Sequence, residues 1–461
     1  MTEAPADRSS EPAADVVVVG GGLAGLATAT QLARRGRRVV CLEPRAFPRP
    51  GVGESLEFSA PALLAELGVR VDTEDHRPHL FPKTSVQIIS SADDRFTVWP
   101  PAWFARPPIW CSRIAFHADR FELDHQLMWL AVDAGVEIRR ERVTTVDHDG
   151  DRITAVTTDR GSRLAASWYV DASGHAARLF GRALDLDKIA LGQPRMAFWT
   201  RVAEPPRGHA TNLYFAEPTA DDLSWAWEIP LNPAEVSIGV VMSSDRLGAL
   251  RRLGLRPFEV FRDELATLPR LSRILDRHPD LEVAATAYTP YRHRRSIGPN
   301  WVLVGDASAM VDPLTSNGVT SALRHAERAA RTVSSALDRG GVRRRHAWAY
   351  NHTVPATVAT LEQAMETFLY QPTMRQRLGL RWAVNLYAGT GVITNSLYAK
   401  INPKTPAAAL VCVSMLAASR VWTSTAGWAL RQLGQLRTRR RAPGALCGLP
   451  DREGELLGAR I

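Results

Sequence analysis

The sequence predicts an α/β protein that combines a dinucleotide-binding domain, a second domain built on an antiparallel sheet, and a helical C-terminal region. Residues 15–44 contain a glycine-rich turn between two apolar strands, which is typical of parallel α/β sheets. Residues 195–242 alternate between apolar and polar side chains with a period of two, as antiparallel strands do. After residue 345 the sequence is helical and basic and shows no repeats. A chain of 461 residues is long enough to bury a core of this extent.

The glycine-rich turn follows four consecutive valines, residues 16–19, which suit a strand buried on both faces. Gly20, Gly22 and Gly25 have the G-x-G-x-x-G spacing, which lets the backbone bend tightly and approach a pyrophosphate closely. The helix expected at 24–35 would direct its N-terminal N–H groups and its partial positive charge at the phosphates. This order predicts a dinucleotide site. A plain glycine-rich turn is the alternative interpretation.

An acidic residue follows the second strand, which we expect at 38–42. Glu43 lies 18 residues after Gly25, where a carboxylate hydrogen-bonds a ribose hydroxyl in dinucleotide folds. A carboxylate at this place favours an unphosphorylated ribose. The cofactor is therefore expected to be FAD or NAD.

The overall charge is +9, and much of the excess comes from short arginine runs. These runs are 292–295, 343–345 and 437–441. They form solvated faces or they bind an acidic partner such as a carrier protein. They lack the interleaved aromatic residues of a nucleic-acid groove, so we expect no nucleic-acid partner.

Cysteine usage and the two ends of the chain bear on its environment. The four cysteines are far apart and form no C-x-x-C, so neither a zinc site nor a disulfide framework is expected, and a reduced cytoplasmic setting fits. Residues 1–14 are polar and are expected to be disordered. The apolar run 406–419 is too short to span a bilayer; a buried helix or a helix that touches a membrane fits it. No metal is expected, because His117, His125 and His293 lack metal-ligand spacing and are interpreted as structural or solvated.

Further elements follow from periodicity and from turn residues. Helices are expected at 56–67, 118–134, 257–268 and 319–337, with Ser316 or Asn317 capping the last; strands are expected at 83–89, 95–99, 168–170, 282–288 and 301–306, and two or three strands within 136–163. The proline-rich loop that carries Trp99 and Trp103 walls a pocket for a planar substrate, or it is a surface loop pinned by its aromatic residues.

Six motifs occur in one order along residues 15–340. They are the glycine turn, Gly53-Glu54-Ser55, Asp171-Ala172-Ser173-Gly174, Trp225-x-Trp227-x-Ile229-Pro230, Gly305-Asp306 and Pro313-x-x-Ser316-x-Gly318. This order resembles the flavin-dependent halogenases. The first, third and fifth motifs are shared with other FAD monooxygenases, including aromatic hydroxylases and geranylgeranyl-reductase-like enzymes, whereas the tryptophan motif is specific. The resemblance implies a glutathione-reductase-like FAD-binding domain.

The resemblance also implies the site residues. FAD is expected to contact Gly20, Gly22, Leu23, Ala24, Gly25, Glu43, Gly53, Glu54, Ser55, Arg120, Asp171, Gly305, Asp306, Gly318 and Val319. The halide is expected at Asn317 and Gly318, and the substrate pocket at Trp99, Trp103, Trp225, Trp227 and Thr315. In the family the tryptophan pair is thought to separate flavin from substrate, which is compatible with the plainer role of filling the gap between the sheet and the cofactor domain.

The chemistry implied by the resemblance places one lysine at its centre. Reduced flavin and O₂ give a C4a-hydroperoxide, a halide attacks its distal oxygen, and the hypohalous acid formed is relayed to the substrate. Lys83, 29 residues after Glu54, lies in the region where the family carries its catalytic lysine. Desolvation would lower the pKa of such a lysine and so provide a neutral amine. A solvated residue at a strand end is the alternative for Lys83.

The cofactor and partner expectations follow from the same resemblance. No second G-x-G-x-x-G follows a strand, so reduced FAD is expected to come from a separate NAD(P)H-flavin reductase, with halide as co-substrate. Hydroxylases of this fold lack such a domain too, so its absence does not discriminate between the two classes.

Two positions depart from the family pattern. Met310 stands where the family usually has phenylalanine, and Thr315 stands where indole halogenases have glutamate and phenol or pyrrole halogenases have phenylalanine. Because a threonine cannot act as a carboxylate base, we expect a phenol or pyrrole, free or bound to an acyl or peptidyl carrier protein, rather than free tryptophan. The departures leave open that halogenation has been lost.

Three alternatives to halogenation remain at this point. They are a flavin monooxygenase that hydroxylates or epoxidises, an FAD-dependent dehydrogenase or reductase acting on a lipid-like substrate, and a flavoprotein that only binds a partner. The expected domains are an FAD-binding domain at 15–80, 118–185 and 291–340, a substrate domain at 81–117 and 186–290, and a helical C-terminal region at 341–461.

Overall fold

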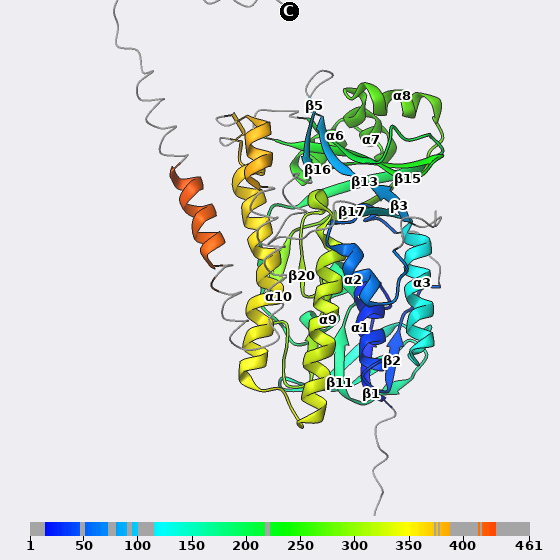
Figure 1. The fold of residues 1–461 in the computed structure, drawn as a ribbon, viewed down its shortest axis with the longest axis vertical. Helices are drawn as coiled ribbons and strands as arrows, with labels where there is room; N and C mark the ends of the chain where they lie inside the picture. Colours follow the sequence, from blue (N-terminus) through cyan, green and yellow to red (C-terminus); the bar gives the residue numbers. More distant parts are fainter. Residues whose placement is uncertain are drawn as a thin grey trace, which may run out of the picture.

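The computed structural model describes residues 14–46, 51–71, 80–89, 95–99, 115–216, 222–372, 375–376, 379–387, 414 and 417–429. Two bodies are stacked along the long axis in Figure 1, one built on a parallel sheet and one on an antiparallel sheet. Helix α10 (Arg344–Met365) runs beside both of them (Figure 1). The predicted combination of an α/β fold with a second, antiparallel sheet is confirmed.

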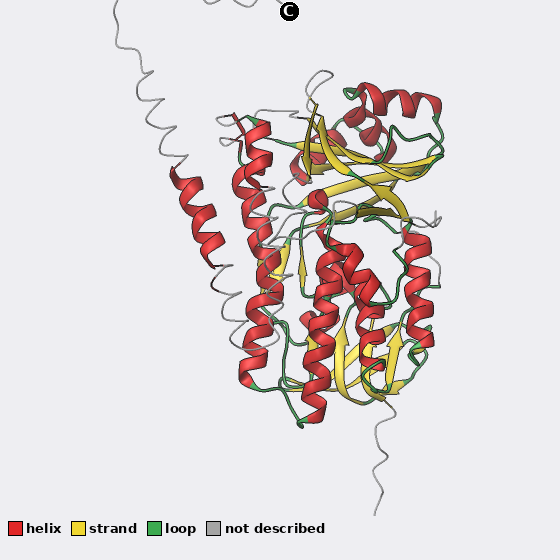
Figure 2. Ribbon diagram, in the orientation of Figure 1, coloured by secondary structure: helices red, strands yellow, loops and turns green. Residues whose placement is uncertain are grey.

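The first body is a five-stranded parallel sheet with strand order β19-β11-β1-β2-β7. Its strands are β1 (Ala14–Val19), β2 (Val39–Leu42), β7 (Glu137–Arg139), β11 (Ala166–Asp171) and β19 (Trp301–Leu303). Helices α1 (Leu23–Ala33), α3 (Arg120–Asp133) and α9 (Asn317–Asp338) cover one face (Figure 2). The valines of β1 are buried on both faces, as strands between two layers must be.

A three-stranded antiparallel sheet covers the other face of the parallel sheet. It consists of β8 (Val143–Asp149), β9 (Arg152–Thr158) and β10 (Arg163–Leu164). Asn300 connects this sheet to the start of β19, because its side chain exchanges hydrogen bonds with the backbone of Ile153. The shared apolar core contains Ile153, Tyr169 and Trp301.

The second body is a seven-stranded sheet with order β17-β13-β16-β15-β14-β4-β5. Its strands are β4 (Ser85–Ile89), β5 (Arg95–Trp99), β13 (Arg195–Val202), β14 (Ala210–Ala216), β15 (Ser224–Asn232), β16 (Glu235–Ser243) and β17 (Ala284–Tyr288). Helices α6 (Ser244–Arg252), α7 (Pro257–Ala266) and α8 (Pro269–Arg277) pack on one face. All neighbours are antiparallel except β14 and β4, which are parallel.

Smaller elements connect the two bodies. These are α2 (Ala60–Glu66), β3 (Leu80–Lys83), β6 (Ala115–Ala118), α4 (Gly174–Ala177), α5 (Leu179–Ala183), β12 (Lys188–Ala190), β18 (Tyr291–His293), β20 (Ala309–Met310), two 3-10 turns at Gly305–Ala307 and Pro313–Thr315, and a π-helical turn at Glu366–Tyr370 that continues α10. β3 pairs with β6, and β12-β18-β20 form a second small sheet.

Two expectations near the interface of the bodies were wrong. The helix expected at 56–67 is only α2, because Ser55 bridges to His117 and the N–H of Leu56 donates to the carbonyl of Phe116. This segment is therefore extended, and Pro61 lies in the first turn of the shorter helix. The strand expected at 83–89 is divided between β3, which pairs with β6, and β4, which pairs with β14. The partner changes at Thr84, whose N–H donates to the carbonyl oxygen of His209.

Two further expectations need smaller corrections. The two or three strands expected within 136–163 are four, because β7 joins the parallel sheet and β8, β9 and β10 form their own. The segment expected to be disordered extends one residue too far, since Ala14 pairs with Ala166 in β1. Residues 1–13 lie outside the described residues.

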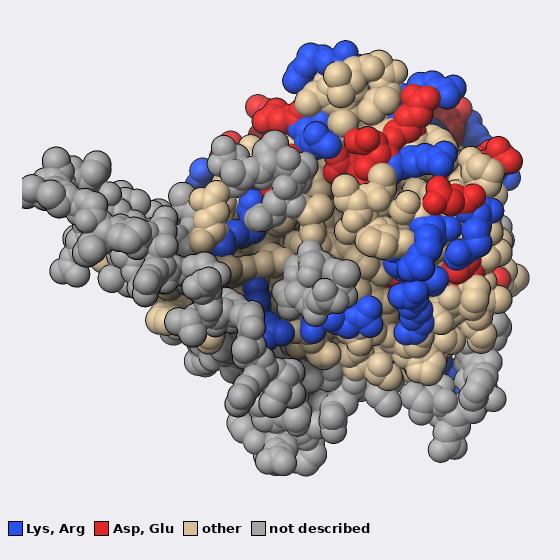
Figure 3. Space-filling view, turned by 90° about the horizontal axis from the view of Figure 1, so that it is seen from above, with Lys and Arg blue, Asp and Glu red and all other residues tan. Residues whose placement is uncertain are grey.

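Charges of both signs alternate on the face that Figure 3 shows. Ion pairs join α6, α7 and α8, such as Arg246 with Glu264 and Arg262 with Asp276. Within the described ranges, no helix is long and apolar enough to cross a membrane, and no group of three or more His, Cys, Asp or Glu side chains could hold a metal ion. Most of the apolar run 406–419, residues 437–441 and three of the four cysteines lie outside these ranges, whereas Cys41 is a buried thiol in β2.

Candidate functional site

The glycine turn has the geometry of a phosphate-binding loop. A Cβ atom on Gly25 would lie 1.8 Å from the carbonyl oxygen of Gly20, so only glycine allows the helix to approach the strand this closely. Gly20 has φ +103°, and its own Cβ would lie 2.4 Å from the carbonyl oxygen of Ala172. Gly22 is the extended residue before α1, which then begins at Leu23 and Ala24. The start of α1 therefore presents backbone at the sheet edge with no side chain in the way.

Glu43 is buried just after β2 and is oriented by the same turn. Its carboxylate accepts hydrogen bonds from the N–H of Gly21 at 2.8 Å and from the N–H of Arg45 at 3.0 Å. The exposed guanidinium of Arg45 lies 3.1 Å from the same carboxylate. This places a fixed carboxylate beside the glycine turn, as a ribose-binding residue requires.

Two other motifs converge on this edge through strand register. Val19, Asp171 and Leu303 are in register on β1, β11 and β19, so all three strands end at the same level. Gly305, which follows β19, has φ +56°, and a Cβ there would lie 2.7 Å from the Cβ of Ala24. The carboxyl ends of parallel strands are the usual place for a dinucleotide, so these three segments outline one cradle.

The acidic residues of these motifs differ in their roles. Asp171 is fully buried and its carboxylate accepts hydrogen bonds from the N–H groups of Ser173 and Phe180, at 2.9 and 2.8 Å. It therefore stabilises its own loop, and burial raises its pKa. The Asp306 side chain is 42% exposed and lies 4.0 Å from His175. Of the two, only Asp306 has a carboxylate that a cofactor could reach.

A third segment, which contains Val52 and Gly53, lies against the first residue of α3. Arg120 donates two hydrogen bonds to Asp124, at 2.9 and 3.0 Å, and a third to the carbonyl oxygen of Val52 at 2.7 Å. Gly53 has φ +94°, which a side chain would strain, and its Cβ would lie 3.1 Å from the Arg120 guanidinium. Glu54 is buried, which raises its pKa, and lies 3.9 Å from Arg201. Arg120 thus fixes the loop that leads to Ser55.

Lys83 lies at the centre of a buried hydroxyl-rich group that we call the Lys83 cluster: Lys83, Ser55, Thr211, His117 and Ser316. Lys83 Nζ donates to Ser55 Oγ at 2.9 Å and to the carbonyl oxygen of Leu56 at 2.7 Å. Ser55 Oγ lies 2.9 Å from Thr211 Oγ1, which lies 2.8 Å from His117 Nε2. The cluster joins β3, β6, β14 and the start of α9.

The ionisation of Lys83 follows from this burial. Its side chain is 1% exposed, and desolvation lowers its pKa to about 7, against a smaller opposing effect of Glu57. A neutral amine has two N–H donors and one lone pair. The two acceptors, Ser55 Oγ and the Leu56 carbonyl, match these two donors and leave the lone pair available. Burial and the charge of Lys83 also hold the pKa of His117 well below its usual value.

The start of α9 touches the Lys83 cluster through Ser316. Ser316 has φ +60° and precedes α9, but its side chain donates to Ser55 Oγ at 3.0 Å instead of capping the helix. Ser316 is thus the N-cap residue of α9, as predicted, but its side chain makes no capping hydrogen bond to the helix. A Cβ built on Gly318 would meet no atom within 4 Å, so space is available beside its amide. Asn317 and Val319 are buried.

The tryptophan pair lies on β15, on the face of the antiparallel sheet that faces α10. The two rings have centroids 5.7 Å apart, and both side chains are buried. Trp227 lies over Gly239, where a Cβ would come within 2.2 Å of the ring, and it donates to Ser237 Oγ at 3.2 Å. Both rings belong to one apolar cluster with Leu314, which directly precedes Thr315. The pair therefore packs between the sheet and the α9 loop.

A second buried polar group lies on the other side of this loop, and we call it the Asp312 cluster: Asp312, Arg195, Glu362, Glu366, Tyr288 and Tyr370. Tyr288 and Tyr370 each donate to Asp312 Oδ2 at 3.0 Å, and Trp225 Nε1 donates to the Tyr370 hydroxyl at 2.9 Å. Arg195 lies 3.5 Å from Asp312, 2.7 Å from Glu366 and 3.5 Å from the centroid of the Tyr370 ring.

The acidic side chains from α10 and its π-helical turn complete this cluster. The N–H of Asp312 donates to Glu362 Oε2 at 3.0 Å. Burial, followed by the charge of Asp312, raises the pKa of Glu362 well above its usual value. The cluster thereby fixes the residue that begins the loop to α9.

Several site predictions fall where the structure gives no side chain. Trp99 ends β5, but its side chain and that of Thr315 are not described, and Trp103 lies outside the described residues. Conversely, His117, Thr211 and the Asp312 cluster were not identified as site residues. His117 was interpreted as structural or solvated because it lacks metal-ligand spacing, and the partner that it has in the structure, Thr211, is 94 residues away. No local sequence signal identifies such a pair.

The comparisons with known proteins agree with this geometry. The model of the family described as tryptophan halogenase matches residues 70–377, and that of FAD dependent oxidoreductase matches residues 15–55. A 1H-pyrrole-2-carbonyl-[peptidyl-carrier protein] brominase of Pseudoalteromonas luteoviolacea (strain 2ta16) is 25% identical, over 70% of this chain and 78% of the relative. A menaquinone reductase of Mycolicibacterium smegmatis (strain ATCC 700084 / mc(2)155) is 30% identical, over 71% and 77%. The solved structure of halogenase PltM with phloroglucinol and FAD has TM-score 0.69 at 18% identity, covering 93% of each chain.

Proposed function

This chain belongs to the flavin-dependent halogenase family, and we propose that it halogenates an electron-rich aromatic substrate of the phenol or pyrrole type in secondary metabolism. The observation that carries the proposal is the position of Lys83. Its amine is buried, is held by Ser55, and is connected through Ser55 to Ser316 at the start of α9.

The residues at the sheet edge fit FAD. Gly20 and Gly25 leave no room for a side chain, and Glu43 is fixed beside the glycine turn. We expect the start of α1 to face the pyrophosphate, with Asp306 and the Arg120 loop lining the rest of the cofactor. Bound reduced FAD, with O₂ and a halide ion, would supply hypohalous acid.

We assign the transfer of the halogen to Lys83. A neutral amine reacts with hypohalous acid to form an N–halogen bond, and the N–H proton and the hydroxyl leave as water. The low pKa of Lys83 keeps about half of the amine neutral near pH 7. The hydroxyls of Ser55 and Thr211 connect the amine to His117, whose pKa burial holds well below its usual value, so that the neutral imidazole orients this chain of hydrogen bonds.

The halide is assigned to the start of α9, at Asn317 and Gly318. The first N–H groups of a helix, together with its dipole, bind anions. The Ser316 side chain is directed at Ser55 and does not compete for these groups. The tryptophan pair of β15 packs in one apolar cluster with Leu314, just before this region.

The substrate class comes from the chemistry of the pocket and from the relatives. Thr315 offers no carboxylate base, so the substrate has to be an aromatic ring that loses its proton readily. The brominase relative is named for a pyrrole carried on a peptidyl carrier protein, and the PltM structure holds phloroglucinol, a phenol. Both kinds of ring are electron-rich. A separate NAD(P)H-flavin reductase would supply the reduced FAD.

The proposal is tested by measuring whether the reaction depends on halide. The protein is mixed with reduced FAD and oxygenated buffer, with and without chloride or bromide, and hypohalous acid is captured by a chemical trap. Phloroglucinol and pyrrole-2-carbonyl substrates, free and carrier-bound, are then added, and products are identified by mass. Trapped hypohalous acid and a halogenated product support the proposal. An oxygenated product that forms regardless of halide identifies a hydroxylase and contradicts it.

A second candidate function is reduction of a quinone-like lipid. The menaquinone reductase relative is 30% identical over 71% of this chain, which favours this candidate. It predicts oxidation of reduced FAD by a menaquinone analogue in the absence of O₂ and halide. Such turnover without any halogenated product would replace the first proposal.

A further inference from the structure

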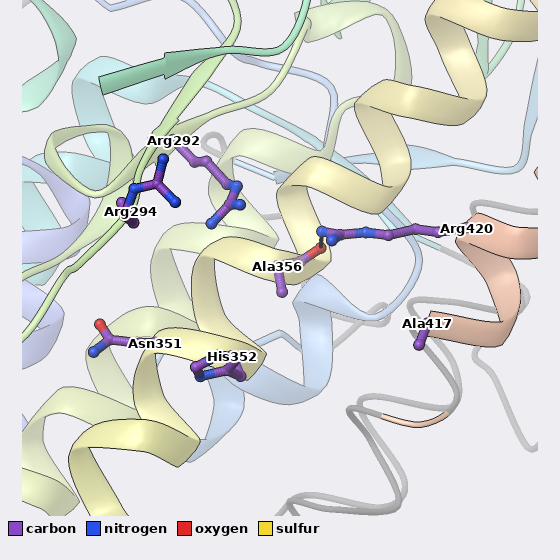
Figure 4. Close-up of a pocket in the computed structure, with 7 residues that line it drawn as sticks. All are labelled: Arg292, Arg294, Asn351, His352, Ala356, Ala417 and Arg420. Carbon is purple, nitrogen blue, oxygen red and sulfur yellow. Dashed lines mark hydrogen bonds between the residues drawn. The ribbon is translucent and has the colours of Figure 1, made fainter. Parts of the chain in front are cut away.

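Outside the site described above, three arginines surround a cavity between β18, α10 and the helix formed by residues 417–429. The cavity has a volume of about 230 Å³ and is lined by Arg292, Arg294, Asn351, His352, Ala356, Ala417 and Arg420. Figure 4 shows Arg292 and Arg294 on one side, with the Arg420 side chain extending toward α10 from the other. A second cavity of about 290 Å³ also contains Arg292 and Arg420. These two side chains therefore separate two adjoining cavities.

The charge around these cavities is not balanced. Arg294 lies 3.0 Å from Asp187 and Glu366 lies 2.7 Å from Arg195, so both of these carboxylates already have a cation. Among the described residues, no carboxylate forms an ion pair with Arg292. Arg292 is only half-buried, yet burial and the charge of Arg294 lower its pKa. Within the described part of the chain, no carboxylate beside Arg292 offsets this repulsion, and an anion bound from solution would do so.

Arg420 is held in place independently of any ligand. Its Nε donates to Thr360 Oγ1 at 3.0 Å, and its Nη2 donates to the carbonyl oxygen of Ala356 at 3.0 Å. Burial and the charge of Arg292 lower its pKa as well. The guanidinium groups of Arg292 and Arg420 therefore repel each other beside one cavity, and that of Arg420 is fixed on α10. Sites that bind oxyanions through bidentate hydrogen bonds have this arrangement.

We propose that Arg292, Arg420 and Arg294 form a binding site for a phosphoryl group. Guanidinium forks match the oxygen geometry of phosphate, and the cavity has room for the group and part of what it is attached to. The phosphoryl group comes from a free phosphorylated small molecule or from the phosphopantetheine arm of a carrier protein. Because the site lies apart from Lys83, the proposal stands whether or not the chain halogenates.

The experiment measures anion binding to FAD-saturated protein, so that the glycine turn is not available to the probe. Inorganic phosphate and 4′-phosphopantetheine are titrated by calorimetry in a chloride buffer of constant ionic strength. We expect both to bind to wild type and to bind at least tenfold more weakly to Arg292→Gln. Arg292→Lys keeps the charge but loses the fork, and is expected to bind with intermediate affinity. Arg251→Gln, an exposed arginine on α6, serves as the matched control and is expected to bind as wild type does.

The two probes distinguish the two sources. Tighter binding of 4′-phosphopantetheine than of phosphate indicates the carrier arm, and equal affinity indicates a free phosphorylated molecule. Arg420→Gln also removes bonds to α10 and can disturb the helix, whereas Arg292→Gln breaks no ion pair of the described residues. Absence of phosphate binding to wild type, or equal binding to wild type and Arg292→Gln, would overturn the proposal.

Discussion

The Lys83 cluster and the Asp312 cluster are both buried and both touch the loop that leads to α9, but they differ in charge balance. Asp312 has Arg195 at 3.5 Å and accepts two tyrosine hydroxyls. Lys83 is hydrogen-bonded to a serine hydroxyl and a carbonyl, neither of which carries a charge. Arg195 opposes the cost of desolvating Asp312, although burial still raises the pKa of Glu362 in the same cluster; around Lys83 the cost appears as a pKa lowered to about 7.

This difference distinguishes residues that stabilise the fold from a residue that reacts. A buried carboxylate with a counter-charge holds its neighbours in place, as Asp312 holds Tyr370 and, through it, Trp225. A buried amine without one becomes neutral near physiological pH and is able to react. We therefore expect changes in the Asp312 cluster to affect folding first and changes in the Lys83 cluster to affect rate first.

The largest effect is expected from Lys83→Met, which keeps the length of the side chain and removes the amine. Halogenation of the aromatic substrate should fall about 10³-fold, within the range for loss of a reacting group. The thermal midpoint should not fall, because the amine whose desolvation outweighs its attraction to Glu57 is removed. Product formation and thermal unfolding are measured on the same preparations. Lys188→Met, at an exposed lysine, is the control, and equal loss of rate and of stability in Lys83→Met would contradict the account.

Asp312→Ala should show the opposite pattern. It leaves Arg195 buried without its carboxylate and removes the acceptor of two tyrosines, so the free energy of unfolding should fall by about 3–5 kcal/mol. Urea unfolding measures this change. Asp187→Ala breaks the exposed pair with Arg294 and should cost less than about 1 kcal/mol. A stable Asp312→Ala protein that has lost only its activity would reverse the roles of the two clusters.

The pH dependence of stability tests the lowered pKa of Lys83. The folded chain releases the Lys83 proton at about pH 7, whereas the unfolded chain keeps it up to about 10.5. Between these values the unfolded state binds more protons, so this residue makes stability rise with pH, by at most about 1.4 kcal/mol per unit. Urea unfolding at pH 7 and pH 9 should show a steeper rise in wild type than in Lys83→Met. Parallel curves would mean that Lys83 titrates normally.

The smallest effect is expected from Thr211→Val, which removes the hydroxyl between Ser55 and His117 without changing the volume. The free energy of unfolding should fall by about 1 kcal/mol, and the rate of halogenation should fall about fivefold, as expected for the loss of one hydrogen bond. Thr357→Val, in α10, is the matched control, because its hydroxyl bonds only to its own helix. Loss of stability without loss of rate would make Thr211 a structural residue.

The sequence predicts the parts of the site that depend on local backbone chemistry. The glycine spacing, Glu43 and the Gly305-Asp306 motif meet at one sheet edge because strand register follows from buried strands. The extended conformation of residues 53–56 was missed because it depends on pairing with β6, about 60 residues later. The Asp312 cluster was missed for the same reason, since its members come from four distant segments and none has a local pattern. Ser316 shows the same limit, because its tertiary contact with Ser55 replaces the capping hydrogen bond of its side chain.

The most direct test of the account is the ionisation of Lys83 itself. The chain contains four lysines, so ¹³C labelling of the lysine side chains gives four Cε resonances that can be followed by NMR as pH changes. The resonance that is absent from Lys83→Met identifies Lys83. The account predicts that it titrates near pH 7, well below the ordinary lysine value of 10.5. A midpoint above pH 10 for all four resonances would show that Lys83 is an ordinary ammonium group, and the proposed halogen transfer would then lose its basis.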